Sequence, residues 1–141
     1  MDPDFTLDRT LSQESSIIAD LTLSRVLLHD QADFPWLILV PRRAQLVEIT
    51  DLSALDQAHL WREVALVITI MKQHLGAYKV NVGALGNVVR QLHIHVIARY
   101  QDDKAWPSPV WGRPRTPYTP EQKQDVISRM TQWIEEGVDH V

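Results

Sequence analysis

One long stretch of helical periodicity, with two β-prone runs on each side of it, most constrains the fold of this chain. Apolar residues recur every three or four positions over residues 61–75, which predicts a helix with one buried face. Ser53 can cap the start of this helix, and Gly76 is a natural end. The predicted buried face consists of Trp61, Val64, Ala65, Ile68, Met71 and Leu75.

The β-prone part before the helix has the pattern of an antiparallel hairpin. Residues 25–29 and 36–40 are largely apolar, and residues 30–35 between them carry turn-forming Asp and Pro. Pro41 cannot donate a backbone hydrogen bond, so the second strand ends there or lies at an edge. Residues 1–20 have a mixed pattern, in which we expect only a short helix over residues 7–14.

The part after the helix predicts a second hairpin and then an irregular segment. Residues 78–85 and 91–99 are β-prone, and Gly86 and Asn87 between them suit a turn or a bulge. Residues 102–117 are rich in proline and tryptophan, which is incompatible with regular sheet or helix. The sequence Thr-Pro-Glu-Gln at 119–122 has the signals of a helix start, and we expect a last helix over about residues 120–136.

The order strand, strand, long helix, strand, strand, helix predicts an α+β fold with an antiparallel sheet. We expect one domain over residues 1–141, because a chain of this length can bury a single sizeable core.

Composition and charge exclude several classes of function. The net charge of −4 argues against a general affinity for a nucleic acid polymer, and the longest apolar run, Val64–Ile70, is too short to span a membrane. The absence of cysteine excludes disulfides, thiolate metal sites and cysteine nucleophiles, and it fits a reducing compartment. Because the start of the chain lacks a signal-peptide pattern, we expect a cytoplasmic protein.

The second strand of the predicted second hairpin carries the candidate functional residues. Successive side chains of a strand point to opposite faces, so Gln91, His93 and His95 share one face and the apolar residues 92, 94 and 96 share the other. Two imidazoles and an amide in such a segment each need a hydrogen-bonding partner or a cleft. We therefore expect the function of the chain to reside here.

Three interpretations of the two histidines are open from the residues alone. They could bind zinc or iron, which requires a third protein ligand such as His29 or an aspartate. They could be a structural pair in a polar patch. They could also catalyse, because a neutral imidazole is a competent nucleophile toward phosphorus when its other nitrogen is held by an acceptor.

The residues around the histidines carry a resemblance to a known family. Gln91–Ile97 resembles the signature of the histidine triad (HIT) superfamily of nucleotide hydrolases and transferases, in which three histidines alternate with apolar residues. Residues 80–87, 39–42 and 106–112 look like a bacterial branch of the same superfamily, so that the resemblance covers about residues 24–112. It implies a HIT-like fold with an antiparallel sheet of about five strands, a long central helix and a C-terminal helix.

The resemblance also implies roles for individual residues. His93 matches the histidine that becomes nucleotidylated, His95 matches the one that contacts phosphate, and Gln91 replaces the first histidine of the triad. The matching residues for nucleotide or phosphate binding are Asp30, Asn81, Gly86 and Asn87.

The implied function is cleavage of a nucleotide or dinucleoside polyphosphate, such as a diadenosine polyphosphate, at its α-phosphate. The partners expected from the resemblance are a purine nucleotide or dinucleotide and a second copy of the chain, without a cofactor or a bound metal. Val88 and Trp36 stand where many members have polar side chains. A nucleotide-binding module with little turnover, or a metal-binding protein that uses His93 and His95, are the alternatives.

The remaining histidines and the flanking residues are expected to have structural roles. His59 and His74 lie on the long helix and are expected to be solvated or structural, and Arg99 is expected to be a solvated residue at a strand end. Trp106 and Trp111 are expected to serve in packing or subunit contacts.

Overall fold

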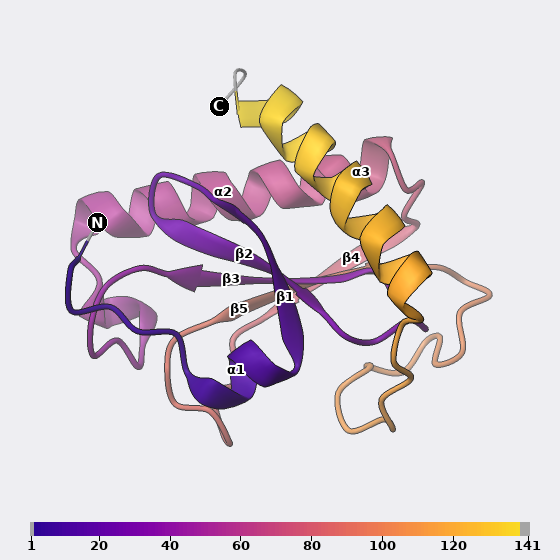
Figure 1. Cartoon of the computed structure of the whole chain (residues 1–141), viewed down its shortest axis with the longest axis horizontal. Coiled ribbons are helices and arrows are strands. Elements are labelled where there is room, and N and C mark those ends of the chain that lie inside the picture. Colours follow the sequence, from indigo (N-terminus) through magenta and orange to yellow (C-terminus); the bar gives the residue numbers. More distant parts are fainter. Residues whose placement is uncertain (1, 139–141) are drawn as a thin grey trace.

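The computed structural model describes residues 2–138, which form one five-stranded antiparallel sheet with helices on both sides (Figure 1). The strand order is β1-β2-β3-β5-β4. The strands are β1 (Ser15–Asp20), β2 (Ser24–His29), β3 (Trp36–Pro41), β4 (Lys79–Gly83) and β5 (Ile94–Arg99). The helices are α1 (Arg9–Gln13), the 3₁₀ turn η1 (Ile49–Asp51), α2 (Ala54–Gln73) and α3 (Pro120–Val138). The predicted α+β class and the five-stranded HIT-like architecture are confirmed.

The first predicted hairpin is confirmed as β2 and β3. It pairs Ser24 with Pro41 and Leu28 with Leu37. The sequence pattern missed β1, which pairs with β2 at the sheet edge. Only Ile18 of β1 is buried, and its serine and acidic residues give no apolar alternation to recognise. The predicted short helix is present as α1, with Asp8 as its N-cap.

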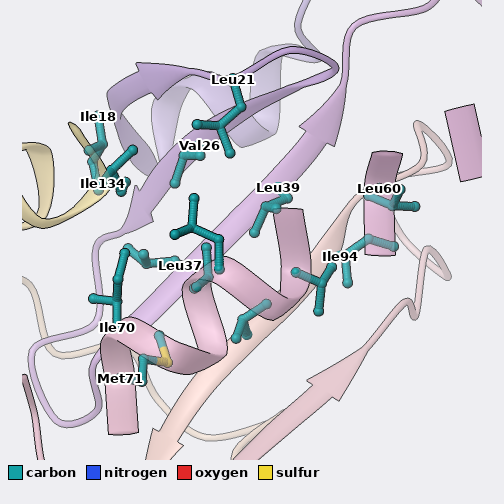
Figure 2. Packing of buried hydrophobic residues seen from close by; sticks show 14 of the residues in the cluster. Ile18, Leu21, Val26, Leu37, Leu39, Leu60, Ile70, Met71, Ile94 and Ile134 are labelled. Atoms are coloured by element: carbon teal, nitrogen blue, oxygen red, sulfur yellow. The ribbon is translucent and has the colours of Figure 1, made fainter. Parts of the chain in front are cut away.

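The side chains of the sheet alternate between two faces that differ in what covers them. One face, which we call the helix face, is covered by α2 and α3 and forms the larger core. Figure 2 shows Leu37, Leu39 and Ile94 of this face packed against α2. The opposite face, which we call the site face, carries Trp36, Ile38 and other residues, and α1 and the irregular segment after β5 cover it.

The long helix α2 starts after Ser53, whose hydroxyl accepts the amide of Asp56, and Gly76 follows its end with φ of 61°. The predicted buried face is wrong in part, because Trp61 and Ala65 are exposed and Ile68 and Leu75 are only partly buried. The buried residues are Leu60, Glu63, Val64, Leu66, Val67, Ile70 and Met71.

Glu63 gives the physical reason for this rotation of the helix. Its carboxylate accepts hydrogen bonds from the backbone amides of Leu23 and Ser24, at 2.9 Å each. A buried charge with two donors is satisfied, so the helix turns this polar position toward the sheet and Trp61 toward solvent.

The second pair of strands, β4 and β5, is antiparallel as predicted, but residues 84–93 between them form a loop longer than a tight turn. The prediction that Gln91 and His93 lie inside the strand is wrong, because β5 begins at Ile94. The backbone amide of Leu92 donates to the carbonyl of Leu46 instead of to a neighbouring strand.

The last helix α3 starts as the sequence indicates and ends later. Thr119 and Gln122 exchange two hydrogen bonds, which is the predicted capping box. The helix continues through Gly137 to Val138 and packs Met130 and Ile134 into the core of the helix face. Within residues 2–138, no helix combines the length and the apolar character that a membrane crossing requires.

Candidate active site

The two histidines of the motif lie at the start of β5 on the site face, where they are largely buried. The ring centroids of His93 and His95 are 4.9 Å apart, and the planes are nearly perpendicular. His95 pairs with Ile38 of β3 on one side and with Gly83 of β4 on the other. This central place in the sheet fixes the backbone of the site from both sides.

His93 is oriented by a backbone carbonyl. Its Nδ1 lies 2.6 Å from the carbonyl oxygen of Gln91. A carbonyl only accepts, so Nδ1 carries the proton and the lone pair of the neutral ring is on Nε2. The arrangement supplies the acceptor that a histidine nucleophile requires.

His95 has the opposite tautomer. The indole Nε1 of Trp36 donates to Nδ1 of His95 over 2.9 Å, which leaves the proton of the neutral ring on Nε2. Burial, followed by the neighbouring His93 and His29, lowers the pKa of His95 to about 3. At neutral pH the ring is therefore an uncharged hydrogen-bond donor.

Further aromatic rings lie next to His95 on the site face and form a row with it. The ring of His29 lies 4.6 Å from that of Trp36, and Trp111 contacts both Trp36, at 6.1 Å, and His95, at 5.7 Å. Burial is the main cause that lowers the pKa of His29. An added Cβ at Gly83 would lie 3.1 Å from Cη2 of Trp111, so the missing side chain at Gly83 makes room for this ring.

A cavity of about 400 Å³, which we call the catalytic cavity, opens in front of both histidines. Gly86 and Asn87 form part of its wall, and Gly86 has a positive φ of 67°. The other walls come from α1, from the row of aromatic rings and from the segment after β5. Arg113 and Arg115 of that segment bring positive charge, and Glu14 brings a carboxylate.

The side chain of Gln91 does not line the catalytic cavity and binds the N-terminal segment instead. Its Oε1 accepts the amide of Asp8, and its Nε2 donates to the carbonyl of Thr6, both over 2.8 Å. Gln91 therefore holds the N-terminal segment that leads into α1, while its own carbonyl holds His93. The expectation that it shares a strand face with the histidines is wrong, because it precedes β5 and the N-terminal segment binds its amide.

The structure does not bring Asp30 and Asn81 into the catalytic cavity. The carboxylate of Asp30 accepts from Arg115 at 2.8 Å and from the backbone amide of Tyr118 at 2.9 Å, so it anchors the chain before α3. The side-chain oxygen of Asn81 accepts from Arg99 at 2.9 Å. Both polar groups have structural partners.

The prediction that Arg99 is solvated is wrong, because it is 1% exposed. Its guanidinium donates to Asp103, Asn81 and the carbonyl of Ser108, and it lies over the rings of Phe34 and Trp106. The ion pair with Arg99 holds the pKa of Asp103 well below its usual range. The acidic residue Asp103, four positions after Arg99, was the feature of the sequence that could have indicated this ion pair.

Sequence reasoning also missed the part that Trp36, Arg113 and Arg115 take in the site. The motif around His93 and His95 covers only a few residues, so it does not predict which residues from distant parts of the chain line the cavity. Among residues 2–138, no group of three or more His, Asp or Glu side chains is arranged to hold a metal ion, so the metal interpretation finds no third ligand there.

Two neighbouring imidazoles lie at the start of a central strand, on a five-stranded antiparallel sheet that the two long helices α2 and α3 cover on one face. The family model described as HIT domain matches residues 10–102, and the chain belongs to this family.

Solved structures agree with this assignment. A histidine triad protein from Bradyrhizobium japonicum is 40% identical, with a TM-score of 0.88, over 96% of this chain and 99% of that one. A histidine triad protein from Marinobacter aquaeolei is 41% identical, with a TM-score of 0.91, over 94% and 97%. The diadenosine triphosphate hydrolase of Plasmodium falciparum, at 16% identity, a TM-score of 0.63, and 94% and 84% coverage, shares the fold. A comparison with curated proteins gave no match.

Proposed function

We propose that this protein cleaves nucleotides at the α-phosphate, as a hydrolase or a nucleotidyl transferase, through a nucleotidyl intermediate on His93. The observation that carries the proposal is the 2.6 Å contact between Nδ1 of His93 and the carbonyl of Gln91, which leaves Nε2 as the nucleophilic nitrogen. Membership of the HIT domain family supports nucleotide hydrolase or transferase chemistry in general.

The reaction has two displacements at phosphorus. In the first, Nε2 of His93 attacks the α-phosphorus, a P–N bond forms, and the bond to the leaving group breaks with its electron pair on the leaving group. In the second, water attacks the same phosphorus and the P–N bond breaks. His93 regains its lone pair, a proton passes to solution, and a nucleoside monophosphate is released. In a transferase, another nucleophile replaces the water.

His95 stabilises the charge on the phosphate oxygens in this scheme. Its Nε2 carries a proton because Trp36 occupies Nδ1, and its low pKa keeps the ring neutral. A fixed donor aimed at developing negative charge lowers the barrier without a proton transfer. We assign the binding of phosphate oxygens to Gly86 and Asn87, because both line the same cavity as the histidines.

Gln91 has a positioning role in this proposal and does not touch the substrate. Its side-chain bonds to Thr6 and Asp8 fix the residue whose carbonyl orients His93. For Asp30 and Asn81, the bonds to Arg115 and Arg99 support structural roles in place of the expected nucleotide contacts.

A purine nucleotide or dinucleotide is the substrate class that we propose. The catalytic cavity offers aromatic and aliphatic surface from Trp111, Val110 and Leu11, and cations from Arg113 and Arg115. Such a combination suits an apolar base joined to phosphates. The name of the structurally similar diadenosine triphosphate hydrolase supports an adenine nucleotide.

The test measures the release of mononucleotide from a panel of dinucleoside polyphosphates and nucleoside phosphoramidates. We expect His93→Ala to lower turnover by about 10³-fold or more, because it removes the nucleophile. His59→Ala, on the side of α2, is the matched control and should keep wild-type turnover. Mass spectrometry of a quenched reaction should find the nucleotide on the His93 peptide. Wild-type turnover by His93→Ala would refute the mechanism.

A nucleotide-binding module with little turnover is the second candidate. It is favoured by Val88, which lines the catalytic cavity without a hydroxyl to assist a leaving group. Calorimetry with adenosine and guanosine monophosphates separates the two candidates. Binding with no release of mononucleotide above background would support the module, and release that depends on His93 would exclude it.

We further propose that the protein works as a homodimer in the cytoplasm. The strand β4 lies at the sheet edge, and Tyr78, Val82 and Leu85 on and beside it are exposed. An unpaired edge with exposed apolar side chains favours pairing with a second copy. Sedimentation at micromolar concentration tests the dimer, and fractionation of cells tests the location; a sedimenting monomer would contradict the first.

A further inference from the structure

The carboxylate of Asp30, which the resemblance assigns to nucleotide binding, is already occupied by other partners. Its Oδ2 accepts from Arg115 at 2.8 Å, and its Oδ1 accepts from the backbone amide of Tyr118 at 2.9 Å. Asp30 also does not line the catalytic cavity. The sugar hydroxyls of a nucleotide bound there need another acceptor, because a polar group that leaves water without a partner costs free energy.

Glu14 is the only acidic residue among the described residues that line the catalytic cavity. It follows the end of α1 and directly precedes β1. Its amide donates to the carbonyl of Thr10 at 3.0 Å, and its carbonyl accepts from the amide of Asp30 at 2.9 Å. Its side-chain carboxylate makes no hydrogen bond or ion pair with any residue of 2–138. The backbone of Glu14 is therefore fixed, while both carboxylate oxygens are available to a ligand.

Glu14 lies next to His29, and the ring of Trp36 stands between His29 and the reacting histidines. Ser15, the residue after Glu14, pairs with His29 across β1 and β2. Burial lowers the pKa of His29, and the carboxylate of Glu14 is the strongest charge that opposes this shift. The ring of Trp36 lies 4.6 Å from that of His29 and 5.6 Å from that of His95. The cavity thus has imidazoles at one end and a carboxylate at the other.

This separation of groups suits the two ends of a nucleotide. A carboxylate accepts hydrogen bonds from hydroxyl groups on both of its oxygens, and such charge-assisted bonds are stronger than neutral ones. The same carboxylate repels phosphate, so it disfavours the reversed orientation of the substrate. The phosphate then lies at the histidines and the sugar lies toward Glu14.

We propose that Glu14 recognises the sugar of the substrate, and that its two carboxylate oxygens accept hydrogen bonds from the 2′ and 3′ hydroxyls of a ribose. The inference rests on the proposed function, in which the α-phosphate lies at His93. A ribonucleotide makes both of these bonds, and a 2′-deoxyribonucleotide makes only one. Glu14 is therefore a specificity-determining residue that selects ribonucleotides.

The experiment compares adenosine 5′-phosphoramidate with its 2′-deoxy analogue, which differ in a single hydroxyl and have the same leaving group. We expect kcat/KM of the wild-type protein to be about 10-fold higher for the ribonucleotide, because Glu14 is exposed and water replaces part of the lost bond. Glu14→Gln, which keeps the size of the side chain and removes its charge, should reduce this preference to less than about threefold. Glu135→Gln, an exposed carboxylate on α3, is the matched control and should keep the full preference.

The ratio of the two kcat/KM values separates recognition from stability, because a loss of folded protein lowers both values equally. A wild-type protein without the preference, or a preference that Glu14→Gln leaves intact, would overturn this proposal and leave the proposed function standing. A preference lost in Asp30→Asn and kept in Glu14→Gln would return the role to Asp30.

If neither phosphoramidate is cleaved, the proposed function fails, and calorimetry still decides on Glu14. Adenosine monophosphate should then bind about 10-fold more tightly than 2′-deoxyadenosine monophosphate, and Glu14→Gln should remove most of this difference. Equal binding of the two nucleotides, or no binding of either, would overturn the assignment.

Discussion

The two faces of the sheet use the same strands for different purposes. On β3, Leu37 and Leu39 pack under the helices, whereas Trp36 and Ile38 face the site. On β5, Ile94 and Val96 pack under the helices, whereas His95 faces Trp36 and the catalytic cavity. The helix face is closed by regular elements, and the site face is closed by loops and a one-turn helix. We infer that stability is concentrated on the first face and chemistry on the second.

The largest expected effect on stability comes from the helix face. Leu39→Ala should lower the free energy of unfolding by about 3 kcal/mol. Leu39 is fully buried, and the packed helix α2 cannot move far enough to fill the cavity that the shorter side chain leaves. Ile38→Ala, one residue earlier on the site face, should cost less, about 2 kcal/mol, because Ile38 borders the open catalytic cavity. Urea unfolding measures both, and an equal or reversed order would break the comparison.

A smaller effect is expected from the link between the N-terminal segment and the nucleophile. Gln91→Ala should lower kcat about 10-fold with little change in KM, because the carbonyl that orients His93 loses the bonds that fix its residue. Gln73→Ala, an exposed glutamine at the end of α2, is the control for kcat. A lower melting temperature with unchanged kcat would show that Gln91 is purely structural.

The pH dependence of stability gives a further test of the site face. Folding lowers the pKa of His95 from 6.5 to about 3, so between these values the unfolded chain binds a proton that the folded chain does not. Stability is therefore fully present above pH 6.5 and decreases as the pH falls toward 3. His95→Asn should flatten this decrease between pH 6.5 and 4.5 in urea unfolding, and His59→Asn should not. An unchanged slope in His95→Asn would contradict the assignment.

The same contrast separates what the sequence could predict from what it could not. Local periodicity predicted the hairpin β2–β3, the existence of the helix α2, and the alternation of His95 with the buried residues Ile94 and Val96. The cover of the site face depends on contacts between distant residues, such as Gln91 with Thr6 and Arg115 with Asp30. No pattern within a short window reports such contacts.

Individual errors have the same cause. Arg99 at a strand end is read as solvated until Asp103 and the rings of Phe34 and Trp106 close over it. Trp61 continues the apolar spacing of α2, but Glu63 decides the rotation of the helix through two backbone amides. In both cases a buried polar interaction decided where the side chain lies.

The contact between Gly83 and Trp111 links two residues that are distant in the sequence. A methyl group at position 83 would lie 3.1 Å from the indole of Trp111, so Gly83→Ala requires this ring to shift by a few tenths of an ångström. The same ring contacts Trp36 and His95, so the shift would reach the two rings that face each other across the site. A single carbon atom added to β4 is thereby coupled to the position of His95.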